Sequence, residues 1–497
     1  MIRCKQSFRL FPIIFCAALL LGAFFPSLAF AKEGDLVLSD LTVVSSSTKV
    51  SASDVLATVD SQGRWALKVD GTSNDVARLR TLVAGDSSKS IVIPSGTTLQ
   101  VSSPIRLGNN TKLDATGATI VATTDGKGII SHYVDGINYS ALTNVIITGG
   151  TWKGVLNADV NAATIMRFAH ASNVTIKDAS IICNVESHAI ELIACADCTV
   201  SGCTINGTYG SATHADSNEE AIQIDIATPA TAPGVLKETG NAYMVAGQTC
   251  KNITVTGCTI NSGRGVCANF AKTNTEYMQN CHTGIRITNN NITGNTAEPL
   301  VLYNSLNSYV TGNTIVTNTP LSRDSYSDGL AIRLKGKCTA ARKAFVYVAK
   351  NTVQGGRWGI NITSDEKNVY YKSLTYKNNK TSAKAGSSKG IHISKDNNRA
   401  VMYLANLKAP TVKKVSSSGS ALKVKWKKVS GATGYQVRAT AKSGSAKTTV
   451  SAGKSTLSKT LKLKKKKAYY VQVRAKKKLG GCVLYSSWST KKAAKTK

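Results

Sequence analysis

Charged residues recur at fixed places around a short alternating motif, and their spacing could bring two carboxylates together. The motif reads Ala-Ile-Glu-Leu-Ile at 189–193 and Ala-Ile-Gln-Ile-Asp at 221–225. Side chains alternate faces along a strand, so the apolar residues would face a core while Glu191 and Asp225 face outward. A pair of carboxyl groups on one surface can supply a general acid and a general base.

Aligning the copies of this motif groups its outward positions into three columns. From the spacing and rise of strands, we expect Glu191 and Asp225 to lie about 8 Å apart. This separation falls within the ~6.5–9.5 Å typical of inverting glycosidases and exceeds the ~5–5.5 Å of retaining ones. The first column holds Asn138, Arg167, Glu191, Gln223 and Cys267, the second holds Asp225, Asn269, Tyr303 and Arg333, and the third, just before each strand, holds His188, Glu220, Arg264, Glu298 and Asp328.

These charges also have a purely structural interpretation. An exposed ion pair of Arg167 with Glu191 would contribute only ~0–1 kcal/mol, and Glu220 could pair with a neighbour in the same way. However, the carboxylates gather at one level, whereas most other outward columns carry Thr, Asn and Ser. We therefore predict Glu191 as the base and Asp225 as the acid, with Glu220 in reserve. The predicted substrate-binding residues are Arg167, His188, Gln223, Arg264, Asn269, Tyr303 and Arg333.

The motif is the first half of a repeat. A second alternating stretch follows it, as in C-T-V-S-G-C-T-I at 198–205 and N-I-T-V-T-G-C-T-I at 252–260, and the closest spacing is 24 residues, from Ile181 to Ile205. Strand–turn–strand units at this period indicate a solenoid, and 24 residues suit a three-sided parallel β-helix. Further copies of the first strand are predicted at 136–139, 299–303, 329–333, 359–363 and 390–394.

The N-terminal region indicates export. Basic residues precede an apolar run at 10–25, and Ala29-Phe30-Ala31 supplies a cleavage site, so residues 1–31 are typical of a signal peptide. No later stretch is long and apolar enough to span a bilayer. We expect a protein that is secreted or held at the cell surface.

A helix is expected to close one end of the solenoid. Residues 32–72 form a polar extension, with a short helix predicted around 52–60. The segment 73–83 then has apolar residues at helical spacing after a capping Ser. Such a helix would cover the open end of the β-helix domain predicted at 73–407.

From this helix onward the chain resembles the pectin-lyase-like proteins, the superfamily of polygalacturonases and pectate lyases. The resemblance covers roughly residues 70–400 and implies an all-β protein, a right-handed parallel β-helix. The polygalacturonase catalytic pattern (N-T-D, D-D, G-H-G, R-I-K) is missing apart from Arg333-Leu334-Lys335, so its catalytic residues are not transferred. The segments that carry the resemblance are I-P-S-G-T-T-L (93–99), G-A-T-I (117–120), N-V-I-I-T-G-G-T-W-K-G (144–154), M-R-F-A-H-A-S-N-V-T-I (166–176), H-A-I-E-L (188–192) and E-A-I-Q-I-D (220–225).

Residues 226–248 interrupt the repeat between two adjoining coils. They contain T-P-A-T-A-P-G and little periodicity. We predict a loop that overhangs the strand face and forms one wall of a binding site.

The cysteines fall mostly at repeat positions, where stacked coils about 4.8 Å apart would permit disulfides. Cys203 and Cys258 are expected instead as buried thiols of a ladder that continues as Asn290, Asn313 and Asn351. Disulfide and thiol both remain open for Cys195 and Cys250. No CxxC pair with matching histidines indicates zinc, and no metal site is predicted.

Residues 408–497 resemble a fibronectin type III module. Trp426 and Tyr435 would be core residues, and Tyr470 would lie near the tyrosine-corner position. This module contains no Asp or Glu, while the whole chain has 62 basic and 28 acidic residues and a net charge of +34. Such a module would be attracted to anionic cell-wall polymers.

These observations favour a polysaccharide-cleaving glycoside hydrolase. The alternatives are a non-catalytic adhesin or glycan-binding protein, and a polysaccharide lyase with Arg264 or Arg333 as base. A cofactor is expected only for the lyase, which would use Ca²⁺ to neutralise a uronate. We expect a monomer whose partner is a polysaccharide, with no nucleic acid bound.

Overall fold

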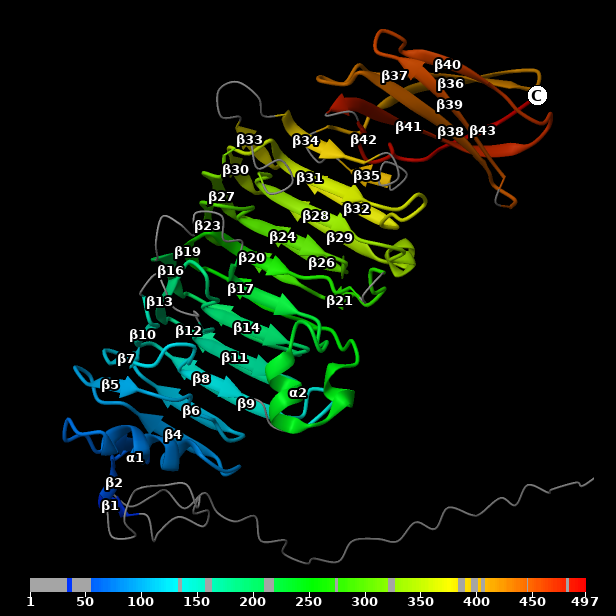
Figure 1. Cartoon of the computed structure of the whole chain (residues 1–497). Coiled ribbons are helices and arrows are strands. Elements are labelled where there is room, and N and C mark those ends of the chain that lie inside the picture. Colours follow the sequence, from blue (N-terminus) through cyan, green and yellow to red (C-terminus); the bar gives the residue numbers. More distant parts are fainter. Residues whose placement is uncertain are drawn as a thin grey trace, which may run out of the picture.

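The computed structural model describes residues 34–37, 55–132, 136–156, 163–209, 219–272, 276–320, 327–382, 389–394, 401–403, 407–444, 446–479 and 482–497. The signal peptide predicted at 1–31 lies outside the described residues. Most of the described chain winds into coils that stack along one axis, with a smaller β-sandwich at the end opposite the first helix (Figure 1). No helix within the described ranges is long and apolar enough to cross a membrane.

The coils form a right-handed parallel β-helix, in which each coil adds one strand to each of three parallel sheets. The sheet that carries the predicted site is called the site sheet below. It contains β8 (Ile130–His132), β11 (Met166–Ala169), β14 (Ile190–Ile193), β17 (Glu220–Asp225), β20 (Arg264–Ala268), β24 (Leu300–Tyr303), β28 (Leu330–Leu334), β31 (Trp358–Ser364) and β34 (Lys389–Ile393).

The other two sheets complete each coil. One contains β4 (Lys89–Val92), β6 (Thr111–Asp114), β9 (Leu142–Thr148), β12 (Ala171–Lys177), β15 (Thr199–Ser201), β18 (Thr254–Thr256), β22 (Arg286–Thr288), β26 (Ser308–Thr311), β29 (Phe345–Ala349), β32 (Ser373–Lys377) and β35 (Val401–Tyr403). The other contains β5 (Thr98–Val101), β7 (Thr119–Ala122), β10 (Thr151–Lys153), β13 (Ser180–Asn184), β16 (Thr204–Tyr209), β19 (Thr259–Ser262), β23 (Asn291–Gly294), β27 (Thr314–Thr317), β30 (Thr352–Gln354) and β33 (Lys380–Ser382).

The core lies inside the coils, as the alternation predicts. Ile190, Ile222 and Leu330 have no exposed surface. One predicted strand is wrong: residues 136–139 form a turn, and Asn138 and Tyr139 have φ of 56° and 66°, which a strand does not allow. The site-sheet strand of that coil is β8, earlier in the chain.

The helix α1 (Asn74–Val83) is present as predicted and lies at one end of the β-helix (Figure 1). Its Leu79, Leu82 and Val83 are fully buried. The short helix predicted around 52–60 is wrong, because V-L-A-T-V forms a strand that pairs on both sides. This strand is β2 (Val55–Val59), and its neighbours are β1 (Gly34–Val37) and β3 (Trp65–Leu67). On its other side, β3 pairs in parallel with β4.

A ladder of buried amides follows the predicted thiol positions along the coil interior. Asn290 Nδ2 donates to Asn313 Oδ1 at 3.0 Å, and Asn313 Nδ2 donates to Asn351 Oδ1 at 2.9 Å. The ladder begins at Cys258, whose backbone N–H donates to Asn290 Oδ1 at 2.9 Å. Cys203, Cys258, Cys195 and Cys250 are all free and buried, so the thiol interpretation holds for both pairs.

The C-terminal module is a sandwich of two antiparallel sheets. Trp426 and Tyr435 are buried with ring centroids 5.3 Å apart, as expected for core residues. The tyrosine-corner contact belongs to Tyr469 and not to Tyr470, because the Tyr469 hydroxyl accepts the Lys464 N–H at 3.1 Å. The strands are β36 (Val412–Ser418), β37 (Ala421–Trp426), β40 (Ser458–Lys462), β38 (Gly434–Ala441), β39 (Lys447–Gly453), β41 (Ala468–Leu479), β42 (Cys482–Tyr485) and β43 (Lys492–Lys495).

Replacing Asn313 by Ala should strongly destabilise the β-helix. The change leaves buried donors and acceptors of the ladder without partners, at about 1–3 kcal/mol for each group. We expect the free energy of unfolding to fall by about 2–4 kcal/mol, measured as the urea midpoint by circular dichroism. Asn318→Ala is the matched control, because Asn318 makes an exposed contact to Asn295. Equal effects of the two changes would contradict a stabilising role for the ladder.

Candidate functional site

The strand register places the predicted columns on the outer face of the site sheet. Arg167 pairs with Glu191, Glu191 with Gln223, and Gln223 with Cys267. Asn138 does not belong to this column, since Ser131 takes its place beside Arg167. The other two columns also agree with the pairing: Tyr303 faces Arg333, and Glu220 faces Arg264.

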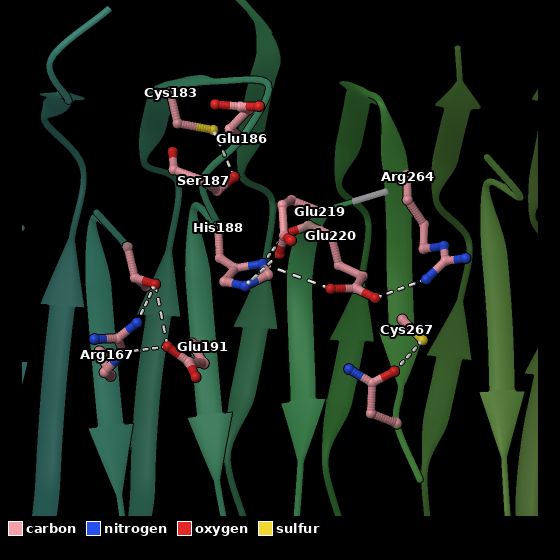
Figure 2. Close-up of polar contacts among 12 residues, drawn as sticks. Arg167, Cys183, Glu186, Ser187, His188, Glu191, Glu219, Glu220, Arg264 and Cys267 are labelled. Carbon is pink, nitrogen blue, oxygen red and sulfur yellow. Dashed lines mark hydrogen bonds and ion pairs between the residues drawn. The ribbon is translucent and has the colours of Figure 1, made fainter. Parts of the chain in front are cut away.

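Glu191 is held by two donors from the preceding coil, one of which is Arg167 (Figure 2). Arg167 Nε donates to Glu191 Oε2, and Thr164 Oγ1 donates to the same oxygen at 3.1 Å. Arg167 Nη2 also donates to Thr164 Oγ1 at 2.8 Å, which fixes the guanidinium. The carboxylate points out of the coil as predicted, but it is only 3% exposed. Its predicted solvent exposure is therefore wrong, because neighbouring side chains cover it.

Asp225 is buried to the same degree, so its predicted exposure is also wrong. Its Oδ1 accepts the backbone N–H of Ile226 at 2.7 Å, and no cation pairs with it within the described part of the chain. Burial, and then the negative charge of Glu191, raise the pKa of Asp225 well above its ordinary value. The environment of Asp225 therefore favours its protonated form.

Near Glu191, His188 contacts two further acids (Figure 2). His188 Nε2 is 3.0 Å from Glu219 Oε2, and Nδ1 is 2.7 Å from the Glu220 backbone oxygen. Burial lowers the pKa of His188, but the hydrogen bond to Glu219 and the charges of Glu220 and Glu191 outweigh it and raise this pKa to about 9. His188 is therefore an imidazolium at neutral pH.

These three residues are also the group of described side chains best placed to hold a metal ion. The ligand atoms of His188, Glu219 and Glu220 lie within 4.8 Å of one another. However, Glu220 Oε1 already accepts Arg264 Nη1 at 2.8 Å. A bound cation would have to compete with both the imidazolium and the guanidinium, so this geometry favours an ion-pair cluster.

From Glu220 a chain of ion pairs continues along the face towards later coils. Arg264 Nη2 donates to Glu298 at 3.0 Å. Arg333 Nη2 then lies 2.6 Å from Glu298 and 2.9 Å from Asp328. All these side chains are buried, and the ion pairs set each charge against an opposite one inside the protein.

Tyr303, predicted to bind substrate, is engaged in this same network. Its hydroxyl accepts Arg333 Nη1 at 3.0 Å, and its ring lies 4.7 Å from that of Phe270. Burial raises the pKa of Tyr303. Of the predicted substrate-binding residues, those with partly exposed side chains are Arg167, His188, Gln223 and Asn269, whereas Arg264, Tyr303 and Arg333 are buried.

Residues 226–248, called the wall loop below, overhang the site sheet as predicted (Figure 1). They contain two short helices, α2 (Pro233–Thr239) and η3 (Ala242–Val245), that lack an obvious sequence signal. Apolar residues of the loop pack on Ala169 and Ile193, at the ends of β11 and β14. His170 Nε2 donates to the Met244 backbone oxygen at 2.7 Å and anchors the loop.

Two residues of the site were not predicted from the sequence. Glu219 directly precedes Glu220, and its carboxylate is half-exposed beside His188. Thr164 occupies the column of His188 one coil earlier, so extending that column backward could have found it.

No family model matches the chain, and no curated protein matches it. The A-module of the mannuronan C-5 epimerase AlgE6 from Azotobacter vinelandii is 11% identical, with 69% of this chain and 89% of that chain covered and a TM-score of 0.35. The endo-xylogalacturonan hydrolase from Aspergillus tubingensis is 12% identical, with 66% and 95% covered and a TM-score of 0.31.

A third solved structure matches a smaller part of the chain. The FN1–FN3 domains of chicken CNTN1 are 27% identical over 19% of this chain, with a TM-score of 0.16. The match spans 33% of that structure's length. At these scores, nothing about the reaction follows from the three likenesses.

The charge of His188 should make stability depend on pH. Its folded-state pKa of about 9 lies above the ordinary 6.5, so its contribution is complete below pH 6.5 and is lost as the pH rises through 9. The loss is on the order of 3 kcal/mol. We expect the urea midpoint to fall over this window, and His188→Gln to flatten the profile.

His392→Gln is the matched control for this experiment, since His392 lies six coils further on and contacts Asn361. A wild-type slope in His188→Gln would contradict the ion-pair assignment.

Proposed function

We propose that this protein is a secreted carbohydrate-active protein, a glycoside hydrolase that cleaves a polysaccharide laid along the site sheet. The observation that carries the proposal is the contrast between two neighbouring carboxyl groups. Glu191 accepts hydrogen bonds from Arg167 and Thr164, whereas Asp225 is buried without a cationic partner among the described residues, and its pKa is raised. Environments that separate two carboxyl groups in this way assign an acid and a base.

In the proposed reaction, Asp225 donates its proton to the leaving glycosidic oxygen. Glu191 removes a proton from the attacking water, and its negative charge helps Asp225 to stay protonated until the transfer. The separation of the Glu191 and Asp225 carboxyl groups that strand geometry predicts leaves room for that water. Such a separation corresponds to inversion at the anomeric carbon. Glu220 is a weaker candidate for either role, because Arg264 and His188 already hold its carboxylate.

The partly exposed side chains around this pair would bind the sugar. Gln223 lies one strand from Glu191, and Asn269 follows Asp225 in its column. Both can donate and accept hydrogen bonds, so they suit sugar hydroxyls. The wall loop closes one end of the strands and would limit how far the glycan extends.

A non-catalytic glycan-binding protein is the second candidate. It is favoured by the ion pairs that neutralise Glu191, Glu220, Glu298 and Asp328. In such a protein these ion pairs would serve only to stabilise the outer face of the site sheet.

A lyase that uses Arg264 or Arg333 as base is disfavoured. Burial lowers the pKa of each guanidinium, but the surrounding carboxylates outweigh this effect and raise both pKa values above the ordinary range. Neither side chain can readily give up a proton.

Glu191→Gln and Asp225→Asn should each abolish most of the turnover. The amides keep the shape of the side chains and remove the proton transfer, which contributes about 10²–10⁴-fold. We expect kcat to fall by this factor on a glycan that the protein cleaves, while glycan affinity and melting temperature change little. Glu238→Gln, on the exposed side of α2, is the control and should retain activity. Wild-type kcat in both site variants would rule out this pair.

The basic module should hold the protein at anionic polymers of the cell envelope. Residues 408–497 carry no acidic side chain, and their lysines on β37 and β40 are exposed. Deleting this segment should abolish retention on isolated cell walls at low salt, and high salt should release the intact chain. Equal retention of the two proteins at low salt, or retention of the intact chain that high salt does not weaken, would contradict this role. Co-sedimentation with isolated cell walls measures the effect of the deletion and the effect of salt.

A further inference from the structure

Two cysteines in segments outside the strands of the coils lie sulfur to sulfur at the edge of the core. The Sγ atoms of Cys281 and Cys338 are 2.7 Å apart, although 57 residues separate them in sequence. Cys281 directly precedes β21 (His282–Thr283), and Cys338 directly precedes η5 (Thr339–Lys343). We propose that this pair is a disulfide site that ties these two segments together.

The accessibility of Cys281 distinguishes this pair from the other thiols. Among the cysteines whose burial the structure describes, Cys281 is the one that is not fully buried, so a small oxidant can reach it. The core thiols donate instead to backbone oxygens of their own coils, as Cys195 does to Ile193 at 3.4 Å. Cys203 likewise donates to Ser201 at 3.4 Å. Those sulfurs are part of the packed interior.

The chemistry requires a small disulfide as oxidant, for which oxidised glutathione serves. The Cys281 thiolate attacks one sulfur of this disulfide, forms a mixed disulfide and releases one glutathione thiolate. The Cys338 thiolate then attacks the sulfur of Cys281, forms the Cys281–Cys338 bond and releases the second glutathione. The two cysteines lose two protons and two electrons, and the electrons reduce the oxidant to two thiols.

The bond would fix a segment that extends the wall of the site sheet. Within residues 276–281, Tyr277 packs so closely on Gly336 that a Cβ added there would lie 2.6 Å from the Tyr277 Cβ. Asn280 Nδ2 donates to the Gly247 backbone oxygen at 2.6 Å, which joins this segment to the wall loop. A disulfide at Cys281 would therefore secure a segment that contacts the wall loop, whichever ligand the site sheet binds.

The test uses the full-length chain and peptide mapping. Trypsin cleavage after Lys and Arg places Cys281 in peptide 273–286 and Cys338 in peptide 338–342, and neither contains another cysteine. The folded protein is treated with oxidised glutathione, denatured in iodoacetamide and digested. We expect these two peptides to be cross-linked, and both to be alkylated singly after reduction.

Thermal melting gives a second readout. Oxidation should raise the melting temperature by several degrees, because the bond restrains a 57-residue span of the unfolded chain. Cys281→Ser should lose this rise, whereas the matched Cys203→Ser should keep it. Singly alkylated peptides after oxidation, glutathione retained on Cys281, or a cross-link to another cysteine would each overturn the proposal. These readouts do not depend on glycan cleavage, so they stand or fall separately from the proposed function.

Discussion

The register between stacked coils is the constraint on which the rest of this structure depends. Parallel pairing aligns each strand residue with its equivalent one coil later, and a slip of one residue would send every outward side chain into the core. The internal ladder from Cys258 through Asn290, Asn313 and Asn351 reinforces this register, because each amide bonds to the coil on either side. The columns of the site sheet exist because this alignment persists along the stack.

Given that register, electrostatics decides what the outer face can do. A buried charge without a partner is costly in free energy. Most charged side chains on the outer face of the site sheet therefore form ion pairs, in a chain that runs from His188 to Asp328. Asp225 is the exception among the described residues, because it is buried, has no ion-pair partner, and has a raised pKa. A carboxyl group with a raised pKa beside the ion-paired Glu191 is an arrangement that acid–base chemistry can use, and a merely solvated surface does not require it.

The sequence repeat predicted which side chains point into the coil and which point outward. It did not predict which outward side chains are covered by their neighbours. Alternation and period identified Ile190 and Ile222 as core and placed Glu191 and Asp225 outward, since these depend only on local geometry. Exposure was mispredicted because it depends on neighbours such as Thr164, which reach across from another coil. The strand at 136–139 failed because two residues there adopt left-handed backbone angles, which the apolar pattern does not show. The contact between Cys281 and Cys338 could not be predicted by aligning the repeats, because both residues lie in irregular segments.

The central claim is that the site sheet hydrolyses a glycosidic bond with Asp225 as acid and Glu191 as base. The most direct measurement is a screen of plant, host and bacterial glycans that records new reducing ends and unsaturated uronide absorbance together. The account predicts that at least one glycan yields reducing ends without that absorbance. Absorbance that rises with the reducing ends would indicate elimination, and glycans that are bound but never cleaved would indicate a binding protein; either result would contradict the claim.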